Sequence, residues 1–223
     1  MTFHEYPDRD LMMLAVAKAL GSELAGFLRR QDRVTLSVPG GSTPGPVFDV
    51  LSELELDWSR VAIVLNDERW VDEASARSNT RLLREHLLRG QAAAARLVPM
   101  VNDAPTPEAG LEALSEGLAP HLPLSLVLLG MGEDMHTASL LPGGDRLAEA
   151  LADDAPALMA MRAPGVPEPR VTLTAPVLRA AMSVHVLITG AEKRAALEAA
   201  AGRPALEAPI NAVLDDATVH WAE

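Results

Sequence analysis

Apolar and polar positions along this chain follow two patterns that alternate from one end to the other. Short, mostly apolar segments are typical of strands buried in a parallel sheet, and they predict strands at 34–38, 61–65, 97–101, 124–129, 157–161, 170–173, 184–189 and 218–221. Between these segments, apolar residues recur every three or four positions, which predicts helices at 8–30, 79–89, 107–121 and 145–151, after Thr43, after Thr174, and beyond Gly190 to about 201. Strands that alternate with helices predict an α/β fold, with a mostly parallel sheet and helices on both faces.

The strand predicted at 124–129 leads into the loop around which we expect the site to be built. The loop begins with small and acidic residues at 130–134, and open α/β sheets bind ligands beyond the carboxyl ends of their strands. His136 follows in this loop, and its ordinary pKa of about 6.5 lets an imidazole exchange protons near neutral pH. Asp134 or Glu133 is close enough in sequence to orient the ring. A solvated histidine in a polar loop would give the same local sequence.

The first predicted strand runs into a second loop, which contains two glycines and two hydroxyl residues. Gly40 and Gly41 let backbone N–H groups approach a ligand closely, and a helix start just beyond them favours negative charge. Because Ser42 and Thr43 add hydroxyl donors, a phosphate group would fit this loop. A tight turn in which Ser42 or Thr43 caps the helix and Pro44 takes its first position would explain the same residues.

Other strand ends carry charged residues. The strand at 61–65 delivers the acidic and basic residues of 67–69, which a surface ion pair would also explain. Arg170 places a cation just before a helix, and Lys193 lies in a first helical turn, where it opposes the helix dipole unless an anion lies nearby. A solvated lysine is the alternative interpretation of Lys193. The segments expected to share one edge of the sheet are 40–43, 67–69, 130–136 and 190–193.

Charge and cysteine content narrow the classes of function. The formal net charge of −12 argues against binding to nucleic acid or to an anionic membrane, because phosphate backbones reward clustered Lys and Arg. An anionic ligand would have to be held by a few local cations against this overall field. The chain has no cysteine, so we expect catalysis to use oxygen and nitrogen groups and no thiolate metal site.

Length and the absence of a linker predict one domain that spans residues 1–223. No segment rich in Pro, Gly and Ser divides the chain, and its length suffices for a substantial core. The N-terminal segment MTFHEYPDRD is acidic and lacks an apolar centre, unlike a signal peptide. No continuous apolar stretch approaches the roughly 18 residues that a membrane span needs. We therefore expect a cytoplasmic protein that contacts no membrane.

Five motifs together resemble the 6-phosphogluconolactonases in identity, order and spacing, over about residues 8 to 214. They are VPGGSTP, NDERWV with a downstream SNTRLLREHLL, LLGMGEDMHTASLLPG, RVTLT and LITGAEKRAAL. The resemblance implies a Rossmann-like α/β fold shared with glucosamine-6-phosphate deaminases and ribose-5-phosphate isomerases. It also implies hydrolysis of 6-phospho-D-glucono-1,5-lactone to 6-phosphogluconate in the oxidative pentose phosphate pathway, with no metal or organic cofactor. The implied partner is this small sugar-phosphate lactone, and the protein would be a monomer or a small homo-oligomer.

The same resemblance assigns roles by position. His136 corresponds to the general base and Arg69 to a cation near the lactone, with Asp67 and Asp134 as orienting residues. The groups that correspond to the phosphate-binding set are Gly40, Gly41, Ser42, Thr43, Arg170 and Lys193. One residue departs from the pattern, because Met135 stands where the family usually has glycine, and methionine enters positive φ less readily.

Two alternatives remain at this point. A deaminase or isomerase of amino-sugar phosphates would share the fold, but the corresponding segment there resembles HIAFNEPG, whose glutamate is replaced here by Leu141. A non-catalytic sugar-phosphate sensor would carry a DNA-binding segment, for which this chain has neither the length nor a basic helix. The retention of His136 and Arg69 also favours an enzyme.

Overall fold

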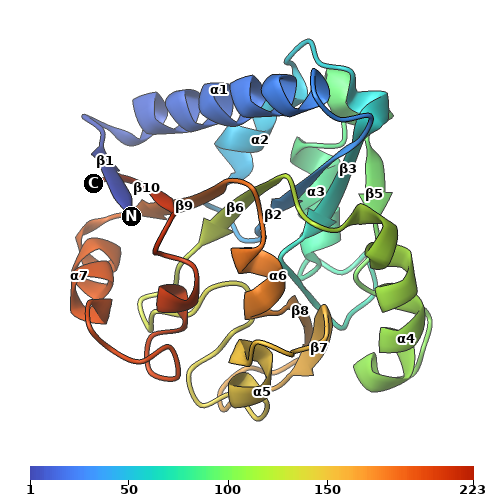
Figure 1. The fold of residues 1–223 in the computed structure, drawn as a ribbon, viewed down its shortest axis with the longest axis vertical. Helices are drawn as coiled ribbons and strands as arrows, with labels where there is room; N and C mark the ends of the chain where they lie inside the picture. Colours follow the sequence, from blue (N-terminus) through green and yellow to red (C-terminus); the bar gives the residue numbers. More distant parts are fainter.

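The computed structural model describes all of residues 1–223 and is built around a seven-stranded sheet, in the order β1-β10-β9-β6-β2-β3-β5 (Figure 1). All neighbouring strands in it are parallel. The strands are β1 (Thr2–Glu5), β2 (Val34–Val38), β3 (Val61–Leu65), β5 (Arg96–Val98), β6 (Leu126–Gly130), β9 (Val184–Thr189) and β10 (Thr218–Ala222). Every residue of β2 and β3 is buried, which explains why these strands read as unbroken or nearly unbroken apolar runs.

A second, smaller sheet lies beside the first and was not predicted. It is antiparallel, in the order β4-β8-β7, and contains β4 (Asp67–Arg69), β7 (Leu158–Met161) and β8 (Arg170–Leu173). β4 is a polar strand, so no apolar pattern in the sequence predicts it. The apolar residues of β7 and β8 predict strands but do not indicate the sheet to which those strands belong. Asn66 connects the two sheets, because its N–H donates to Val38 O at 2.8 Å and its carbonyl accepts from Leu173 N at 2.8 Å.

The helices cover both faces of the large sheet, as predicted, with α1 and α2 on one side and α6 and α7 on the other (Figure 1). α5 lies beside the small sheet and contacts α6. The helices are α1 (Arg9–Leu28), α2 (Gly45–Ser52), α3 (Asn79–His86), α4 (Pro107–Leu118), α5 (Leu147–Leu151), α6 (Ala175–Arg179) and α7 (Ala191–Ala200). Short 3-10 turns are η1 (Trp58–Arg60), η2 (Gly90–Ala94), η3 (Ala119–His121) and η4 (Pro209–Ala212). The helix predicted at 107–121 is therefore α4 followed by η3.

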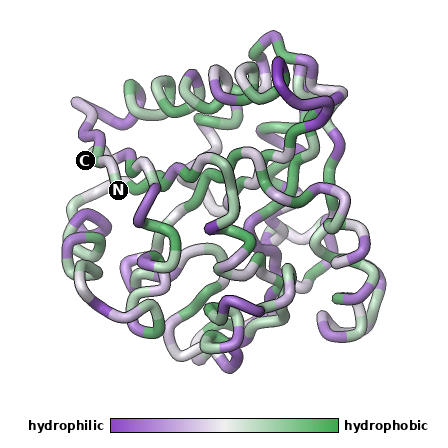
Figure 2. The backbone as a smooth tube through the Cα atoms, in the orientation of Figure 1, coloured by the Kyte–Doolittle hydropathy of each residue, from purple (hydrophilic) through white to green (hydrophobic).

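One apolar cluster of 58 buried residues fills the space between the sheets and the helices. Figure 2 shows hydrophobic colouring along α1 and through the central strands. By length and composition α1 could cross a membrane, contrary to the expectation that no such stretch exists. Its residues Val16, Leu20 and Leu24 are fully buried, so α1 is a core helix that packs against the sheet.

The sheet edge near the C-terminus differs from the prediction. The strand expected at 218–221 as an edge is β10, which lies between β1 and β9. The true edge is β1, which pairs with β10 in parallel from Thr2 to Glu5 and is exposed along its whole length. A fully exposed strand has no buried face, and its sequence TFHE therefore lacks the apolar pattern of a core strand.

Candidate active site

The four predicted segments follow strands that are consecutive in the sheet. β9, β6, β2 and β3 are neighbours and parallel, so their carboxyl ends form one continuous edge. The segments that follow them contain Lys193 at the start of α7, His136, the Gly40–Gly41 turn, and Asp67 at the start of β4, respectively. β4 then carries Asp67 and Arg69 on alternate positions along the small sheet.

His136 and Asp134 form a hydrogen-bonded pair. His136 Nδ1 lies 2.5 Å from Asp134 Oδ1, and the same oxygen accepts from His136 N at 3.2 Å. A carboxylate accepts the Nδ1 proton, so the neutral ring keeps Nε2 as a free acceptor. The hydrogen bond from His136 lowers the pKa of Asp134. The His136 side chain is 36% exposed, so water reaches this pair.

The loop that holds this pair is tightly turned. Met135 has φ 67°, the left-handed conformation that glycine adopts without strain and methionine does not. Ile210 N donates to Met135 O at 3.0 Å, which ties the strained residue to η4. At Gly132, an added Cβ would lie 2.3 Å from His136 Nδ1, so only glycine leaves room for the ring.

Asp67 orients Arg170 and not the histidine. Its Oδ2 accepts from Arg170 Nη1 at 3.2 Å and from Ser139 Oγ at 2.5 Å, and no hydrogen bond joins it to His136. The Asp67 and Arg170 side chains are both largely buried. Ser139 was not among the predicted residues, although it follows His136 by three positions in the same motif. It connects the histidine loop to the small sheet.

Arg69 and Arg170 lie side by side, because they are paired in the register of β4 and β8. Burial and the neighbouring Arg170 charge lower the pKa of Arg69. The Nε atoms of both arginines are buried and make no hydrogen bond. Two adjacent guanidinium groups with unpaired N–H groups favour an anion between or beside them.

The glycine loop presents free backbone donors. Gly41 has φ 85° and faces open space, and the N–H groups of Gly41, Ser42 and Thr43 donate to no backbone carbonyl. The predicted helix cap is wrong, because α2 begins at Gly45 with Pro44 as its N-cap and without a side-chain cap. The hydroxyls of Ser42 and Thr43 therefore remain available.

Lys193 lies in the first turn of α7, as predicted, and is half-buried. It forms no ion pair or hydrogen bond within the chain, unlike its neighbour Arg194, which pairs with Glu5 and Glu198. No hydrogen bond links Lys193 to the other predicted residues; its helix follows β9, which is the neighbour of β6 in the sheet.

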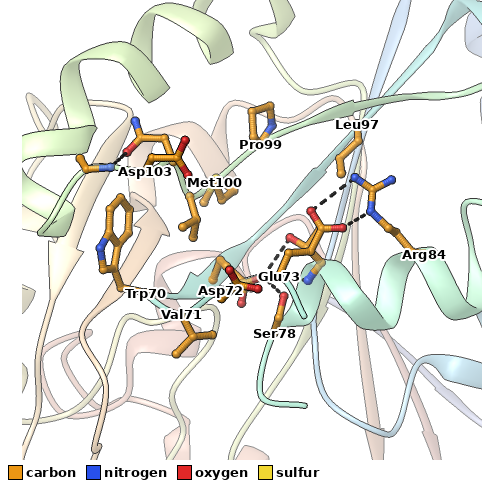
Figure 3. Close-up of a pocket in the computed structure, with 15 residues that line it drawn as sticks. Trp70, Val71, Asp72, Glu73, Ser78, Arg84, Leu97, Pro99, Met100 and Asp103 are labelled. Carbon is orange, nitrogen blue, oxygen red and sulfur yellow. Dashed lines mark hydrogen bonds and ion pairs between the residues drawn. The ribbon is translucent and has the colours of Figure 1, made fainter. Parts of the chain in front are cut away.

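One cavity lies elsewhere and contains none of the predicted residues. It measures about 600 Å³ and is lined by the loops after β4 and β5 (Figure 3). Carboxylates from Asp72, Glu73 and Asp103 dominate its polar lining, and its arginine, Arg84, pairs with Glu73. A phosphate would be repelled there, so we place the site at the edge that carries Arg69 and Arg170.

Comparisons with known proteins identify the family of the chain. Residues 7–221 match the family model for glucosamine-6-phosphate isomerases/6-phosphogluconolactonase. The chain is 40% identical to a 6-phosphogluconolactonase of Rhizobium meliloti, over 98% of this chain and 97% of that one. It is 42% identical to a 6-phosphogluconolactonase of Pseudomonas aeruginosa, over 92% of this chain and 90% of that one.

Solved structures extend the likeness to three dimensions. The crystal structure of a 6-phosphogluconolactonase from Shewanella baltica has a TM-score of 0.96 at 32% identity and covers 100% of this chain and 98% of that one. A monomeric glucosamine-6-phosphate deaminase has a TM-score of 0.82 at 16% identity, which shows a shared fold alone. The chain belongs to the glucosamine-6-phosphate isomerase/6-phosphogluconolactonase family.

Proposed function

We propose that this protein is a 6-phosphogluconolactonase, which hydrolyses 6-phospho-D-glucono-1,5-lactone to 6-phosphogluconate in the oxidative pentose phosphate pathway. The observation that carries this function is the His136–Asp134 pair, whose loop is linked through Ser139 and Asp67 to Arg170. Arg170 is paired with Arg69 on the small sheet, and the Nε–H groups of both arginines are unpaired. The full-length likeness to proteins named 6-phosphogluconolactonase supports this function.

The chemistry of lactone hydrolysis fits these groups. Nε2 of His136 accepts a proton from water as the water oxygen bonds to the lactone carbonyl carbon, while Asp134 stabilises the resulting imidazolium. Arg69 stabilises the negative charge that develops on the carbonyl oxygen. The ring C–O bond then breaks, and the imidazolium returns its proton to the departing ring oxygen. The product acid ionises to 6-phosphogluconate.

The phosphate would be held by backbone and cationic groups at the same edge. The N–H groups and hydroxyls of the glycine loop supply neutral donors, and Lys193 supplies a cation with no competing carboxylate. Arg170 is oriented by its ion pair with Asp67 and adds a second positive charge. These local cations offset the net charge of −12 for an anionic substrate.

The test is an assay of purified protein with freshly generated 6-phospho-D-glucono-1,5-lactone, which hydrolyses spontaneously. We expect acid release to exceed the spontaneous rate in proportion to protein concentration. A rate equal to the spontaneous one at all protein concentrations would refute the proposed function. The deaminase alternative is not favoured, because Leu141 is a buried apolar residue at the position where the deaminase motif has a glutamate.

A further inference from the structure

Asn79, the first residue of α3, is a buried side chain between β4 and the glycine loop. It is 3% exposed, and both ends of its amide are bonded. Its Oδ1 accepts from Arg69 Nη1 at 2.9 Å, and its Nδ2 donates to the main-chain carbonyl of Asp67 at 3.0 Å. Arginine can only donate and a carbonyl can only accept, so this is the amide orientation that satisfies both partners.

The Asn79 amide is not needed to start its helix. Ser78 is the N-cap of α3, and its Oγ accepts from Arg81 N at 3.2 Å. Glu68 accepts from the main-chain N–H groups of Asn79 at 2.9 Å and of Thr80 at 2.7 Å. Because the Glu68 carboxylate accepts from the first main-chain N–H groups of the helix, the Asn79 side chain is not needed as a cap and can hydrogen-bond to β4.

Gly40 leaves the space that this amide occupies. A Cβ at Gly40 would lie 2.0 Å from Asn79 Oδ1, a distance at which the amide would have to move. Gly40 does not have a positive φ, so its backbone conformation alone does not require glycine. Gly40 therefore leaves the space that the Asn79 amide fills. Through this contact, Asn79 lies between the glycine loop and Arg69.

The contacts of Arg69 leave one side of its guanidinium free. Nη1 donates to Asn79 Oδ1 and to Arg77 O at 2.7 Å. Nε is buried without a partner. A guanidinium that is held through Nη1 presents its Nε–H side in one orientation, which suits an oxygen with developing negative charge.

From this arrangement we propose that Asn79 is a positioning residue, which sets the guanidinium of Arg69 for the carbonyl oxygen of the lactone. The proposal rests on the lactonase activity proposed above. A misplacement of about 1 Å in a catalytic group can cost on the order of 100-fold in rate. Asn79→Ala should therefore lower kcat by roughly 10- to 100-fold, with a change in KM below about threefold, because the oxygen becomes charged only in the transition state.

Combination with Arg69→Ala distinguishes positioning from a general structural role. If Asn79 acts through Arg69, the double variant should be no slower than Arg69→Ala alone by more than about twofold, because residues in one network are not additive. Gly40→Ala supplies a second route, since it displaces the amide without removing it. It should lower kcat in the wild-type background and much less in the Asn79→Ala background.

Thr80→Val is the matched control. It removes the hydroxyl that donates to Glu68 at 2.9 Å, so it weakens the same helix start without touching the Asn79 amide, and kcat should stay within about twofold of wild type. If Asn79→Ala does not fold, a double-mutant cycle of Gly40→Ala and Arg69→Ala tests the same coupling. Fully additive effects in an active enzyme would overturn the positioning role alone. No acceleration by the wild-type protein would instead remove the proposed function, and this inference with it.

Discussion

His136 is the single residue on which the proposed chemistry depends most. As the general base it acts in the transition state, so His136→Asn should lower kcat by roughly 10²- to 10⁴-fold and leave KM nearly unchanged. Steady-state assays with the phosphorylated lactone measure both constants. His86→Asn is a matched control, because His86 Nδ1 also contacts a carboxylate, Asp49, at 2.8 Å. A His136→Asn variant that keeps more than about a third of wild-type kcat would exclude the general-base role.

Met135 is a residue at which backbone strain can be tested. Its φ of 67° costs a non-glycine residue about 1–2 kcal/mol, whereas glycine adds about 0.5–1 kcal/mol of unfolded-state entropy. These effects oppose each other, so Met135→Gly should change the free energy of unfolding by less than about 1 kcal/mol and keep or raise kcat. Urea unfolding and steady-state kinetics provide the two measurements. A clear loss of kcat would show that the methionine side chain itself supports the loop.

Lys193 provides a test of phosphate recognition. If it holds the phosphate, Lys193→Ala removes a charge-assisted hydrogen bond worth about 1.5–3 kcal/mol, and KM for the phosphorylated lactone should rise accordingly. KM for unphosphorylated glucono-1,5-lactone should barely change. Lys18→Ala is a suitable control, since Lys18 is exposed on α1 and is the only other lysine. Equal effects of Lys193→Ala on the two substrates would remove Lys193 from the phosphate site.

At the scale of elements, a chain of polar side chains connects β1, β10, β9 and α1, away from the proposed site. Tyr6 Oη lies 2.8 Å from His220 Nδ1, and His220 Nε2 lies 2.9 Å from His185 Nδ1. His185 Nε2 then lies 3.1 Å from Glu23 Oε1, and His4 stacks on His220 from the edge strand. Burial, with smaller effects of His185 and His4, lowers the pKa of His220 to about 3.

This cluster predicts acid sensitivity. His220 is neutral in the folded protein and titrates near pH 6.5 when unfolded, so its contribution to stability is complete above about pH 6.5 and is lost as the pH falls toward about 3. The pKa of Glu23 is also lowered, because the hydrogen bond from His185 and other contacts outweigh burial, and this acts in the same direction. His220→Gln keeps hydrogen-bonding groups without a titrating ring. Its free energy of unfolding, measured in urea, should depend less steeply on pH between 6.5 and 3, and an unchanged slope would contradict this assignment.

At the scale of the whole molecule, the fold does not decide the reaction. A glucosamine-6-phosphate deaminase shares it at a TM-score of 0.82 with 16% identity. We expect the difference to lie in single residues such as Leu141, which is buried and apolar and supplies no carboxylate. We therefore expect no ammonia release from glucosamine 6-phosphate, although this sugar phosphate should compete weakly for the shared phosphate site. Ammonia release at a rate comparable with lactone hydrolysis would overturn the assignment.

The apolar pattern of the sequence is sufficient to locate most of the buried strands. β2, β3, β8 and β9 begin and end at the predicted residues, because each is a short, mostly apolar segment that can be identified without reference to its neighbours. The loop with His136 and Asp134 was also predictable, since the two residues are two positions apart and need only a local turn to meet. The family resemblance added the order of the motifs, and with it the roles of distant residues.

The contacts between polar groups that are distant in sequence depend on the folded arrangement of the strands. Ser139 and Asp67 are separated by 72 positions in the sequence. Their contact depends on the small antiparallel sheet, which the polar sequence of β4 does not predict. The packing of Gly40 against Asn79 is likewise not predictable from the sequence, because glycine is needed there to leave space for the Asn79 side chain and not to adopt a special backbone conformation. Apolar burial leaves a local period in the sequence, whereas hydrogen bonds between loops depend on the order in which strands assemble, and that order is a property of the folded chain.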